Sequence, residues 1–553
     1  MSKCVLIGVD SATFDIIEPM AARGELPNFR RIMENGAWGR LNSTVPPVTP
    51  PAWTSMVTGM NPGKHGIFDF YATPSHGYDR QVVGSGAVRA ATLWGLLSER
   101  GRTAGAINVP MTHPPREVNG FIIPGMQYAL DSREGFAYPQ GLIEEIETAI
   151  GATYEVMHGD ERAHFFDVWE DYARRWREIT EVRTEAILYL MDRHPVDFFM
   201  PVYYSIDAIQ HLFWRHYDPD HPHHDPKLAR KYGDVIPDFY RLCDANIGRI
   251  MERCDDETTV LIASDHGAGP QHKAFYLNRW LMDRGLLVVK EKYRWLLRLP
   301  SHILFKVLRR MGSPAINWTV PIKAWPLLRR RVDPREGLRL AEIIDWGRTR
   351  AFAANYTEQG IYINLRGREP RGIVEPGAEY ERLRAEIADM VREIRDPDTG
   401  EALVEQVVPR EEVYHGPYAG EAADLFLVMK GGTYLIQGGL LGKLVMETTR
   451  ISGTHRSEGI FLAHGPGIAA GRKVENPDIT DIAATVLYAM EEPIPEDMDG
   501  RVIEAAYDPA ALAARPPAPA GASAVEAGGG DGTYDEEDAA KIEDALRKLG
   551  YMG

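Results

Sequence analysis

Short apolar runs alternate with longer amphipathic segments along most of this chain of 553 residues. The runs are rich in Val, Ile, Leu and Thr, which is typical of strands that are buried on both faces of a sheet. They predict strands at 4–9, 103–108, 197–204, 258–263 and 423–429. The amphipathic segments predict helices at 15–34, 52–58, 92–100, 166–193 and 236–253. Because strands and helices alternate, we expect an α/β fold with a doubly wound, mostly parallel sheet flanked by helices.

The pattern changes after residue 287, where amphipathic, locally basic segments begin. We interpret them as an inserted cap, followed by two strands within 351–364 and a helix at 380–395. The predicted organisation is a first core segment at 1–287, a basic helical cap at 288–345, a second core segment with a smaller α+β subregion at 346–508, a Pro/Ala/Gly-rich linker at 509–534 and a C-terminal helix at 535–553.

Composition narrows the class of protein. The formal charge of −17 argues against nucleic-acid binding, which needs a basic face. The three cysteines lack a ligand spacing, so neither disulfides nor a zinc-thiolate site is expected. There is no room for a signal peptide before the first strand, and no apolar stretch approaches the ~20 residues needed to span a bilayer. These features predict a soluble cytoplasmic protein.

Polar side chains directly follow two of the predicted strands. Asp10 follows the run 4–9, whereas Asp265 and His266 follow the run 258–263. The carboxyl ends of parallel strands meet at one edge of a sheet, where open α/β folds place their sites. We therefore expect these three side chains near one crevice, although either aspartate would also suit the N-cap of a following helix.

Two further positions carry potential ligands. Asp207 and His211 are four residues apart, so on a helix they share a face and can bind one ion, although this spacing is also common on solvated helices. His455 lies in a glycine-containing segment and would also suit an ordinary loop.

Thr49 precedes a pair of prolines at the start of a predicted helix. A threonine there is commonly an N-cap. The same position, however, puts its hydroxyl at the positive end of the helix, where a phosphate would also bind. A nearby dication would make this hydroxyl a competent nucleophile.

Taken together, these motifs resemble the alkaline phosphatase superfamily. The matching runs are Gly8-Val9-Asp10, Val48 to Ile67 with Thr49 near its start, Asp207-x-x-x-His211, Ser264-Asp265-His266-Gly267 and Gly453-Thr454-His455 continuing to Phe461. They look most like the type I phosphodiesterase and nucleotide pyrophosphatase branch and the prokaryotic phosphohydrolases or phosphomutases of that superfamily. The resemblance covers about residues 3–285 and 346–505. It implies an alkaline phosphatase-like doubly wound fold with an inserted cap.

The resemblance also implies two metal sites and a nucleophile. Its ligands would be Asp10, Asp265, His266 and the Thr49 hydroxyl for one ion, and Asp207, His211 and His455 for the other. Zinc is the usual occupant in similar enzymes, and manganese suits the same ligands. Thr49 would attack phosphorus and form a covalent threonine phosphoester. The implied activity is a phosphodiesterase or nucleotide pyrophosphatase-like hydrolysis, with small-molecule or lipid-linked phosphoesters as substrates.

In the nucleotide pyrophosphatases that the sequence resembles, an asparagine three positions after the nucleophile helps to hold the phosphoryl oxygen. Here that position is Ala52, so another residue must bind this oxygen. Asn108, after a predicted strand, and Arg456, beside His455, are the candidates. Asn108 would equally suit a turn.

The basic segment 290–331 allows two interpretations. Its lysines and arginines are interleaved with tryptophans and phenylalanine, which suits a peripheral membrane contact or a cap that attracts an anionic substrate. A helical cap with an apolar face packed on the core is the plainer alternative.

The sequence leaves two alternatives to a phosphodiesterase. A phosphomutase, phosphomonoesterase or phosphonate hydrolase of the same fold is a close neighbour of the diesterase prediction. A non-catalytic membrane-surface binding protein is the remaining class, against which the complete ligand set argues.

Overall fold

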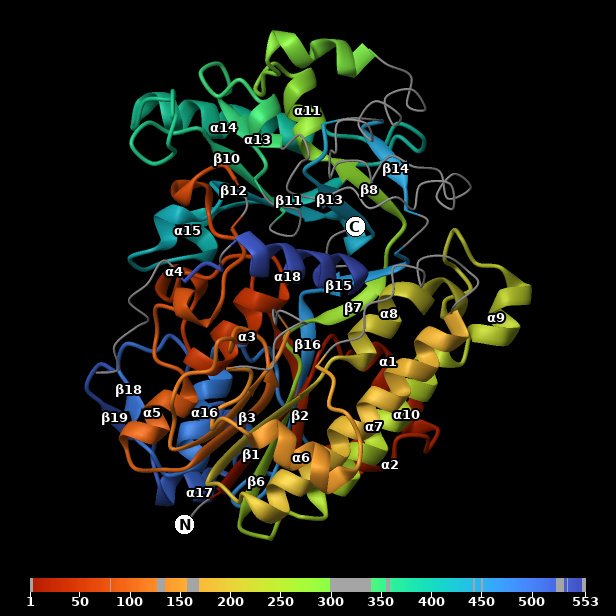
Figure 1. Ribbon diagram of the computed structural model, residues 1–553, viewed down its shortest axis with the longest axis vertical. Helices are drawn as coiled ribbons and strands as arrows, with labels where there is room; N and C mark the ends of the chain where they lie inside the picture. The colour runs from red at the N-terminus through yellow and green to blue at the C-terminus, as the bar shows by residue number, and fades with distance from the viewer. Residues whose placement is uncertain are drawn as a thin grey trace.

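The computed structural model describes residues 3–549 apart from 80, 127–134, 157–168, 299–339, 355–358, 441–442, 449–450, 524–531 and 535. The chain forms a large sheet with helices on both faces and a second, smaller unit above one edge of that sheet (Figure 1).

An eight-stranded sheet is the centre of the larger unit. Its order is β17 (Arg472–Lys473), β2 (Ala37–Asn42), β16 (Glu458–His464), β6 (Thr258–Ala263), β1 (Lys3–Val9), β5 (Phe198–Tyr203), β3 (Ala104–Val109) and β4 (Gly120–Pro124). From β6 to β4 the strands run parallel, whereas β16 is antiparallel to both of its neighbours. All residues of β5 and β6 are buried, as the apolar runs predicted. The mostly parallel α/β sheet is therefore confirmed.

Helices cover both faces of this sheet. On one side lie α1 (Phe14–Ala22), α2 (Pro27–Asn35), α6 (Leu142–Ile150), α7 (Trp169–Arg193), α8 (Ser205–Tyr217), α9 (Pro226–Tyr232) and α10 (Val235–Met251) (Figure 1). On the other lie α3 (Thr49–Thr58), α4 (Pro62–His65), α5 (Leu93–Glu99) and α16 (Asp481–Ala489). Within the part of the chain that the structure describes, no helix combines the length and apolarity needed to cross a bilayer.

The helix predicted at 15–34 is two helices, so that prediction was wrong. The chain leaves α1 after Ala22, and Gly24 adopts a left-handed conformation with φ of 78°. Pro27 then begins α2, where a proline is tolerated because the first helical amide has no partner anyway. The hydrophobic pattern continues through the break and therefore conceals it.

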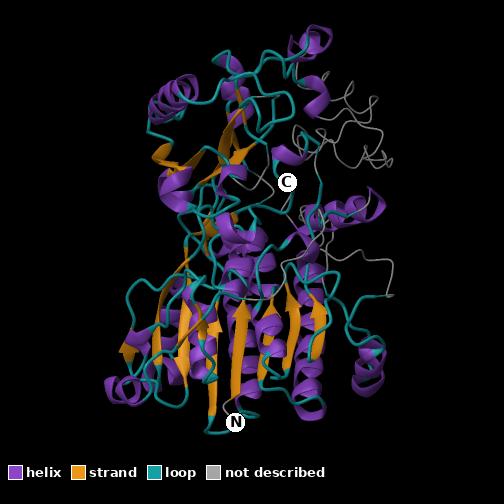
Figure 2. Ribbon diagram, turned by 90° about the vertical axis from the view of Figure 1, so that its left-hand side faces the viewer, coloured by secondary structure: helices purple, strands orange, loops and turns teal. Residues whose placement is uncertain are grey.

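The second unit contains two smaller sheets, which lie above the carboxyl ends of the parallel strands (Figure 2). One has the order β11 (Val404–Pro409), β12 (Leu425–Met429), β10 (Gly360–Ile363) and β9 (Ala351–Phe352), and the other β13 (Tyr434–Gln437), β8 (Lys273–Tyr276) and β14 (Val445–Glu447). Its helices are α11 (Leu277–Asp283), α13 (Leu340–Ile343), α14 (Ala378–Arg392) and α15 (Arg410–Val413). The predicted strand 423–429 is thus β12, outside the large sheet.

This unit has a hydrophobic core of its own. Phe275, Leu281 and Leu287 pack there together with Ile387 and Phe426. The segment 277–287, which the sequence analysis assigned to the first core segment, therefore belongs to the second unit. Most of the predicted basic cap, 299–339, lies outside the described residues, and its beginning forms the short 3-10 helix η4 (Glu291–Arg298).

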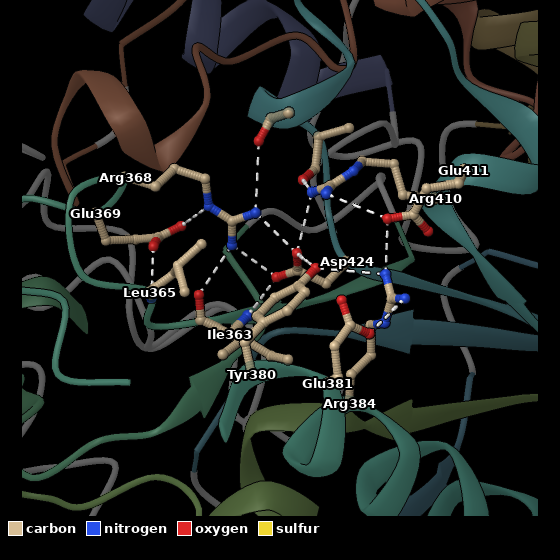
Figure 3. A network of polar contacts seen from close by, with 12 residues as sticks. Ile363, Leu365, Arg368, Glu369, Tyr380, Glu381, Arg384, Arg410, Glu411 and Asp424 are labelled. Atoms are coloured by element: carbon tan, nitrogen blue, oxygen red, sulfur yellow. Dashed lines mark hydrogen bonds and ion pairs between the residues drawn. The ribbon is translucent and has the colours of Figure 1, made fainter. Parts of the chain in front are cut away.

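A buried ion-pair network ties the second unit together (Figure 3). The carboxylate of Asp424, just before β12, is fully buried and accepts hydrogen bonds from Arg368 at 2.6 Å and from Arg410 at 3.0 Å. The Tyr380 hydroxyl of α14 donates to the same carboxylate at 2.7 Å. One aspartate thus joins α14, β12 and the segment around Arg368.

The C-terminal part of the chain returns to the large sheet. The stretch predicted as a linker contains α17 (Pro509–Ala514) and β19 (Pro519–Ala520), which pairs with β18 (Ile494–Pro495), and α18 (Glu536–Leu549) follows it. The Tyr534 ring stacks on His113 with centroids 5.7 Å apart, and its hydroxyl donates to the His113 carbonyl at 2.8 Å. Ile542 of α18 is buried in the main core. The tail therefore covers the loop that follows β3.

Candidate active site and metal centre

Three neighbouring parallel strands carry most of the candidate ligands at their carboxyl ends. Asp10 follows β1, Asp265 and His266 follow β6, and Asp207 lies in the first turn of α8, just after β5. The amide of Asp10 donates to the carbonyl of Tyr203 at 2.9 Å, so the ends of β1 and β5 are in contact. The structure thus brings these residues to one edge of the sheet.

Asp10, Asp265 and His266 form the first cluster. Their potential ligand atoms all lie within 4.8 Å of one another, and all three side chains are fully buried. Neither aspartate caps a helix, because Thr13 is the N-cap of α1 and Asp265 is followed by the strand β7 (Gly267–Pro270). The alternative reading of both as N-caps was wrong.

Asp207, His211 and His455 form the second cluster, again with potential ligand atoms within 4.8 Å of one another. His455 lies in β15 (Gly453–Arg456), which pairs antiparallel with β7, so it is not an ordinary loop residue. A Cβ at Gly453 would lie 2.4 Å from the carbonyl oxygen of Gln210 in α8. Glycine at this position lets β15 approach α8 closely enough for His455 to reach Asp207.

The three imidazoles are all turned in the same way. The Nδ1 atoms of His211, His266 and His455 lie 2.8, 3.1 and 2.9 Å from the backbone carbonyl oxygens of Gly453, Gly267 and Pro47. A carbonyl only accepts, so each Nδ1 carries a proton, and in the neutral ring each Nε2 presents a lone pair to the site.

These lone pairs face other acceptors. Nε2 of His266 is 3.1 Å from Oδ2 of Asp265, and Nε2 of His211 is 3.3 Å from both Oδ1 of Asp207 and Nε2 of His455. Such contacts are repulsive between a neutral imidazole and an acceptor, and either a second proton on the imidazole or a bound cation relieves them. Asp207 raises the pKa of His211 despite its burial, so this imidazole and Asp207 attract each other when His211 is protonated. Histidine ligands of metals typically donate the other ring N–H to a carbonyl in this way. The donor set therefore fits two divalent ions.

The carboxylates are electrostatically strained without such ions. Burial raises the pKa of Asp10, and the negative charges of Asp265 and Asp207 raise it further. Burial also raises the pKa of Asp265, to about 6. Burial acts in the same direction on Asp207, but His211 outweighs it and holds the pKa of Asp207 below its usual range. Burial and the neighbouring His266 lower the pKa of His455.

Thr49 lies beside the first cluster. It is the first residue of α3, its N-cap is Val48, and its hydroxyl makes no capping bond. The interpretation of Thr49 as an N-cap was therefore wrong. Its Oγ1 is buried 3.4 Å from Nε2 of His266, at the positive end of the helix.

Sequence reasoning missed Trp53, which joins α3 to the first cluster. Its indole N–H donates to Oδ2 of Asp10 at 3.2 Å. The same ring lies against β1, where a Cβ at Gly8 would be 2.5 Å from it. Because Trp53 is one helical turn after Thr49, helical periodicity was the signal that could have placed both on one face of α3.

Asn108 lies near this edge with an unusual backbone. It is in β3 at a shift of register, and its φ of 62° is left-handed. Its Oδ1 accepts a hydrogen bond from the Tyr154 hydroxyl at 2.7 Å, and the Tyr204 hydroxyl donates to its backbone carbonyl. Its Nδ2 is buried with no hydrogen-bond partner among the described residues. The Asn108 side chain is thus fixed by its oxygen, and its amide nitrogen remains able to donate to a further group.

Arg456 lies on the other side of β15 from the His455 side chain, because neighbouring strand residues face opposite ways. Its guanidinium donates to the carbonyls of Gly432 at 2.8 Å, Pro270 at 2.6 Å and His455 at 3.0 Å. The structure therefore uses Arg456 to join backbone segments and does not bring its side chain to the side chains of the two clusters.

Comparison with known proteins gives a family match. The model of the family described as type I phosphodiesterase / nucleotide pyrophosphatase matches residues 4–458. Comparison with curated protein sequences gives no match.

Solved structures show the same fold. Phosphonoacetate hydrolase from Sinorhizobium meliloti 1021, in complex with phosphonoformate, aligns with 16% identity and a TM-score of 0.53 over 89% of this chain and 95% of that chain. The alkaline phosphatase PafA aligns with 15% identity and a TM-score of 0.50 over 92% of this chain and 99% of that one. At these identities the similarity concerns the fold, which is alkaline phosphatase-like.

Proposed function

Since the chain belongs to the type I phosphodiesterase / nucleotide pyrophosphatase family of the alkaline phosphatase superfamily, and is therefore a phosphoester hydrolase, we propose that Thr49 is its nucleophile and that two divalent ions bind at the Asp10 and Asp207 clusters. The family implies divalent ions and small-molecule phosphoester substrates. The assignment of the nucleophile and of the two ligand sets is our proposal.

One observation carries it. Two buried imidazoles and the partly buried one of His455 each place Nδ1 on a backbone carbonyl and turn Nε2 toward the buried carboxylates, and Nε2 of His266 lies 3.4 Å from the Thr49 hydroxyl. Divalent ions bound between these groups would neutralise the buried negative charge.

In the proposed reaction the Thr49 oxygen attacks phosphorus and the alcohol or nucleotide leaves. Water then attacks the resulting threonine phosphoester, which releases the phosphate product and restores the hydroxyl. Bound at the two clusters, divalent ions would lower the pKa of the hydroxyl and neutralise charge on the phosphoryl oxygens. Carboxylate oxygens and imidazole nitrogens suit zinc best, with manganese as the second candidate.

We assign Asn108 the role of a hydrogen-bond donor to the substrate. Support comes from its buried Nδ2, which lacks a partner among the described residues, and from its backbone, since left-handed non-glycine residues cluster at functional sites.

Diesters are the proposed substrates, because the nucleophile is a threonine as in the diesterase branch that the sequence resembles. The test is an assay of the purified protein with bis-p-nitrophenyl phosphate, p-nitrophenyl phosphate and a phenylphosphonate ester, each with zinc and with manganese. We expect the highest kcat/KM for the diester. A higher value for the monoester or the phosphonate would replace the diesterase assignment by one of these activities.

The nucleophile has its own test. Thr49→Ala is expected to lower turnover about a thousandfold or more while both ions stay bound. Thr54→Ala, another buried threonine of α3, is the matched control. A rapid-quench digest of the parent enzyme should contain phosphorylated or nucleotidylated Thr49. If Thr49→Ala hydrolyses the best substrate at the parental rate, the nucleophile is another group.

We also propose a location and a surface contact. The cysteines at positions 4, 243 and 254 form no disulfide in the structure, which supports a cytoplasmic location. A peripheral membrane contact through 290–331 is supported by Trp295, which is 45% exposed beside Arg294. Co-sedimentation with liposomes that contain anionic lipid tests this contact.

A further inference from the structure

The turn after β1 is held in an unusual conformation. Ser11, the residue after the ligand Asp10, has a left-handed φ of 63° although it is not a glycine. Its amide donates to Oδ1 of Asp265 at 3.3 Å, and its hydroxyl donates to the carbonyl of Gly267 at 3.3 Å. Ser11 therefore locks the ends of β1 and β6 together, and with them the first cluster.

A second set of bonds connects this turn to α8. Gln210 lies between Asp207 and His211 on that helix, and its buried amide nitrogen donates to the carbonyl of Ser11 at 2.9 Å. Its amide oxygen accepts a hydrogen bond from the Tyr240 hydroxyl of α10 at 3.0 Å.

The Tyr240 hydroxyl also accepts a hydrogen bond from the amide of Thr13 at 3.1 Å, so it connects back to the segment that follows Ser11. The orientation of the Gln210 amide is thus fixed at both ends. Each bond in this chain is buried, and none involves a metal ligand of the second cluster directly.

We propose that Ser11 and Gln210 are positioning residues that set the separation between the two metal positions. This inference rests on the proposed metal pair. Ser11 is bonded to the ligands of the first cluster, and Gln210 is part of the helix that carries two ligands of the second. The hydrogen bond from the Gln210 side chain to the Ser11 backbone carbonyl links the segments that carry the two proposed ligand sets.

The separation matters because both ions act on one phosphoryl group. Two-ion phosphoryl-transfer sites hold their ions about 3.5–4 Å apart. A displacement of about 1 Å can cost roughly a hundredfold in rate through lost orientation. A residue that fixes the spacing therefore affects turnover even when each ion still binds.

A purely structural role for Gln210 makes a different prediction, so the two are separable. Loss of buried hydrogen bonds alone would lower the stability of the metal-free and metal-loaded protein alike. It would leave the magnetic coupling between the two ions unchanged, since that coupling depends on their distance and bridging.

The experiment uses the full chain loaded with manganese. Gln210→Met keeps the size of the side chain and removes both hydrogen bonds. Gln437→Met, at a buried glutamine of β13 in the second unit, is the matched control. The readouts are manganese content, the exchange-coupled electron paramagnetic resonance signal, kcat and KM.

For Gln210→Met we expect two bound ions, a changed coupling signal and a kcat lowered about tenfold to a hundredfold with KM within about twofold. The control should keep the parental signal and kcat. A parental coupling signal in Gln210→Met overturns the inference. A parent protein that binds fewer than two ions overturns the metal pair itself, and with it this inference.

Tyr240→Phe provides a second variant in case Gln210→Met folds poorly. It leaves Gln210 in place and removes the hydrogen bond that orients its amide, together with the bond that the Tyr240 hydroxyl accepts from the amide of Thr13. We expect a smaller change of the same coupling signal, and its absence in a folded, fully loaded Tyr240→Phe protein argues equally against the inference.

Discussion

The imidazole rings of His266 and His455 are stacked, with centroids 3.7 Å apart and planes inclined by 21°. His266 belongs to the first ligand cluster and His455 to the second. They lie at the same end of the antiparallel pair β7–β15, because His266 directly precedes β7 and His455 of β15 is opposite Ala268 of β7. The two clusters are therefore adjoining parts of one centre.

The first prediction concerns the metal-free protein. Burial raises the pKa of Asp265 to about 6, above its value in the unfolded chain. A raised pKa of an acid means that its contribution to stability is present at low pH and is lost as the pH rises through about 6. The Asp265→Asn variant has no carboxyl group to ionise at this position, so it does not lose this stability as the pH rises. In the presence of a chelator the variant should gain a few degrees in Tm over the parent as the pH rises from about 4 to about 6, and keep this gain at pH 8.

Excess zinc should reverse the order of the two Tm values at pH 8, because the Asp265→Asn variant lacks one of the proposed zinc ligands. Differential scanning calorimetry at several pH values measures both effects. A difference in Tm that stays constant with pH would contradict the assigned titration.

The second prediction concerns Trp53. Its indole orients the Asp10 carboxylate from outside the ligand set. Removal of such outer partners typically weakens metal binding about 10- to 100-fold. Trp53→Phe should therefore weaken manganese binding at the Asp10 cluster by about tenfold in a competition titration. Trp94→Phe, a buried tryptophan of α5, is the control, and equal affinities in the two variants would exclude the role of Trp53.

The third prediction separates the side chain of Asn108 from its backbone. Asn108→Asp keeps the acceptor for the Tyr154 hydroxyl but loses the free donor, so kcat/KM should fall about a hundredfold. Asn108→Gly relieves the strain of the left-handed backbone but also removes the side-chain donor, so kcat/KM should fall in this variant as well. Steady-state kinetics with the best substrate provides the measurement. Parental activity of Asn108→Gly would mean that only the backbone matters.

The fourth prediction concerns the network in Figure 3. Asp424→Asn removes the buried negative charge between Arg368 and Arg410 and should cost about 3–5 kcal/mol of unfolding free energy. Glu375→Gln, at an exposed pair with Arg366, should cost at most about 1 kcal/mol. Urea unfolding followed by tryptophan fluorescence compares the two. Equal midpoints would show that the buried network contributes little.

Local patterns were sufficient for the strands of the large sheet and for the approach of Asp10 to Asp265. Asp10 and Asp265 follow strands whose apolar runs are unmistakable, and parallel strands end at one edge, so their proximity could be inferred. What remained hidden depends on long-range packing. The apolar run of β12 predicts a strand but does not determine which sheet it joins, and the placement of Arg456 follows from backbone carbonyls brought near it by folding.

The tail formed by Thr533, Tyr534 and α18 has a consequence for the order of assembly. His113 and Tyr534 are 421 positions apart, and a contact of such range forms only after nearly all of both sheets has been synthesised. The loop after β3 thus receives its last neighbour late in translation. A nascent chain that already contains every residue of the two clusters would still have this loop exposed to solvent.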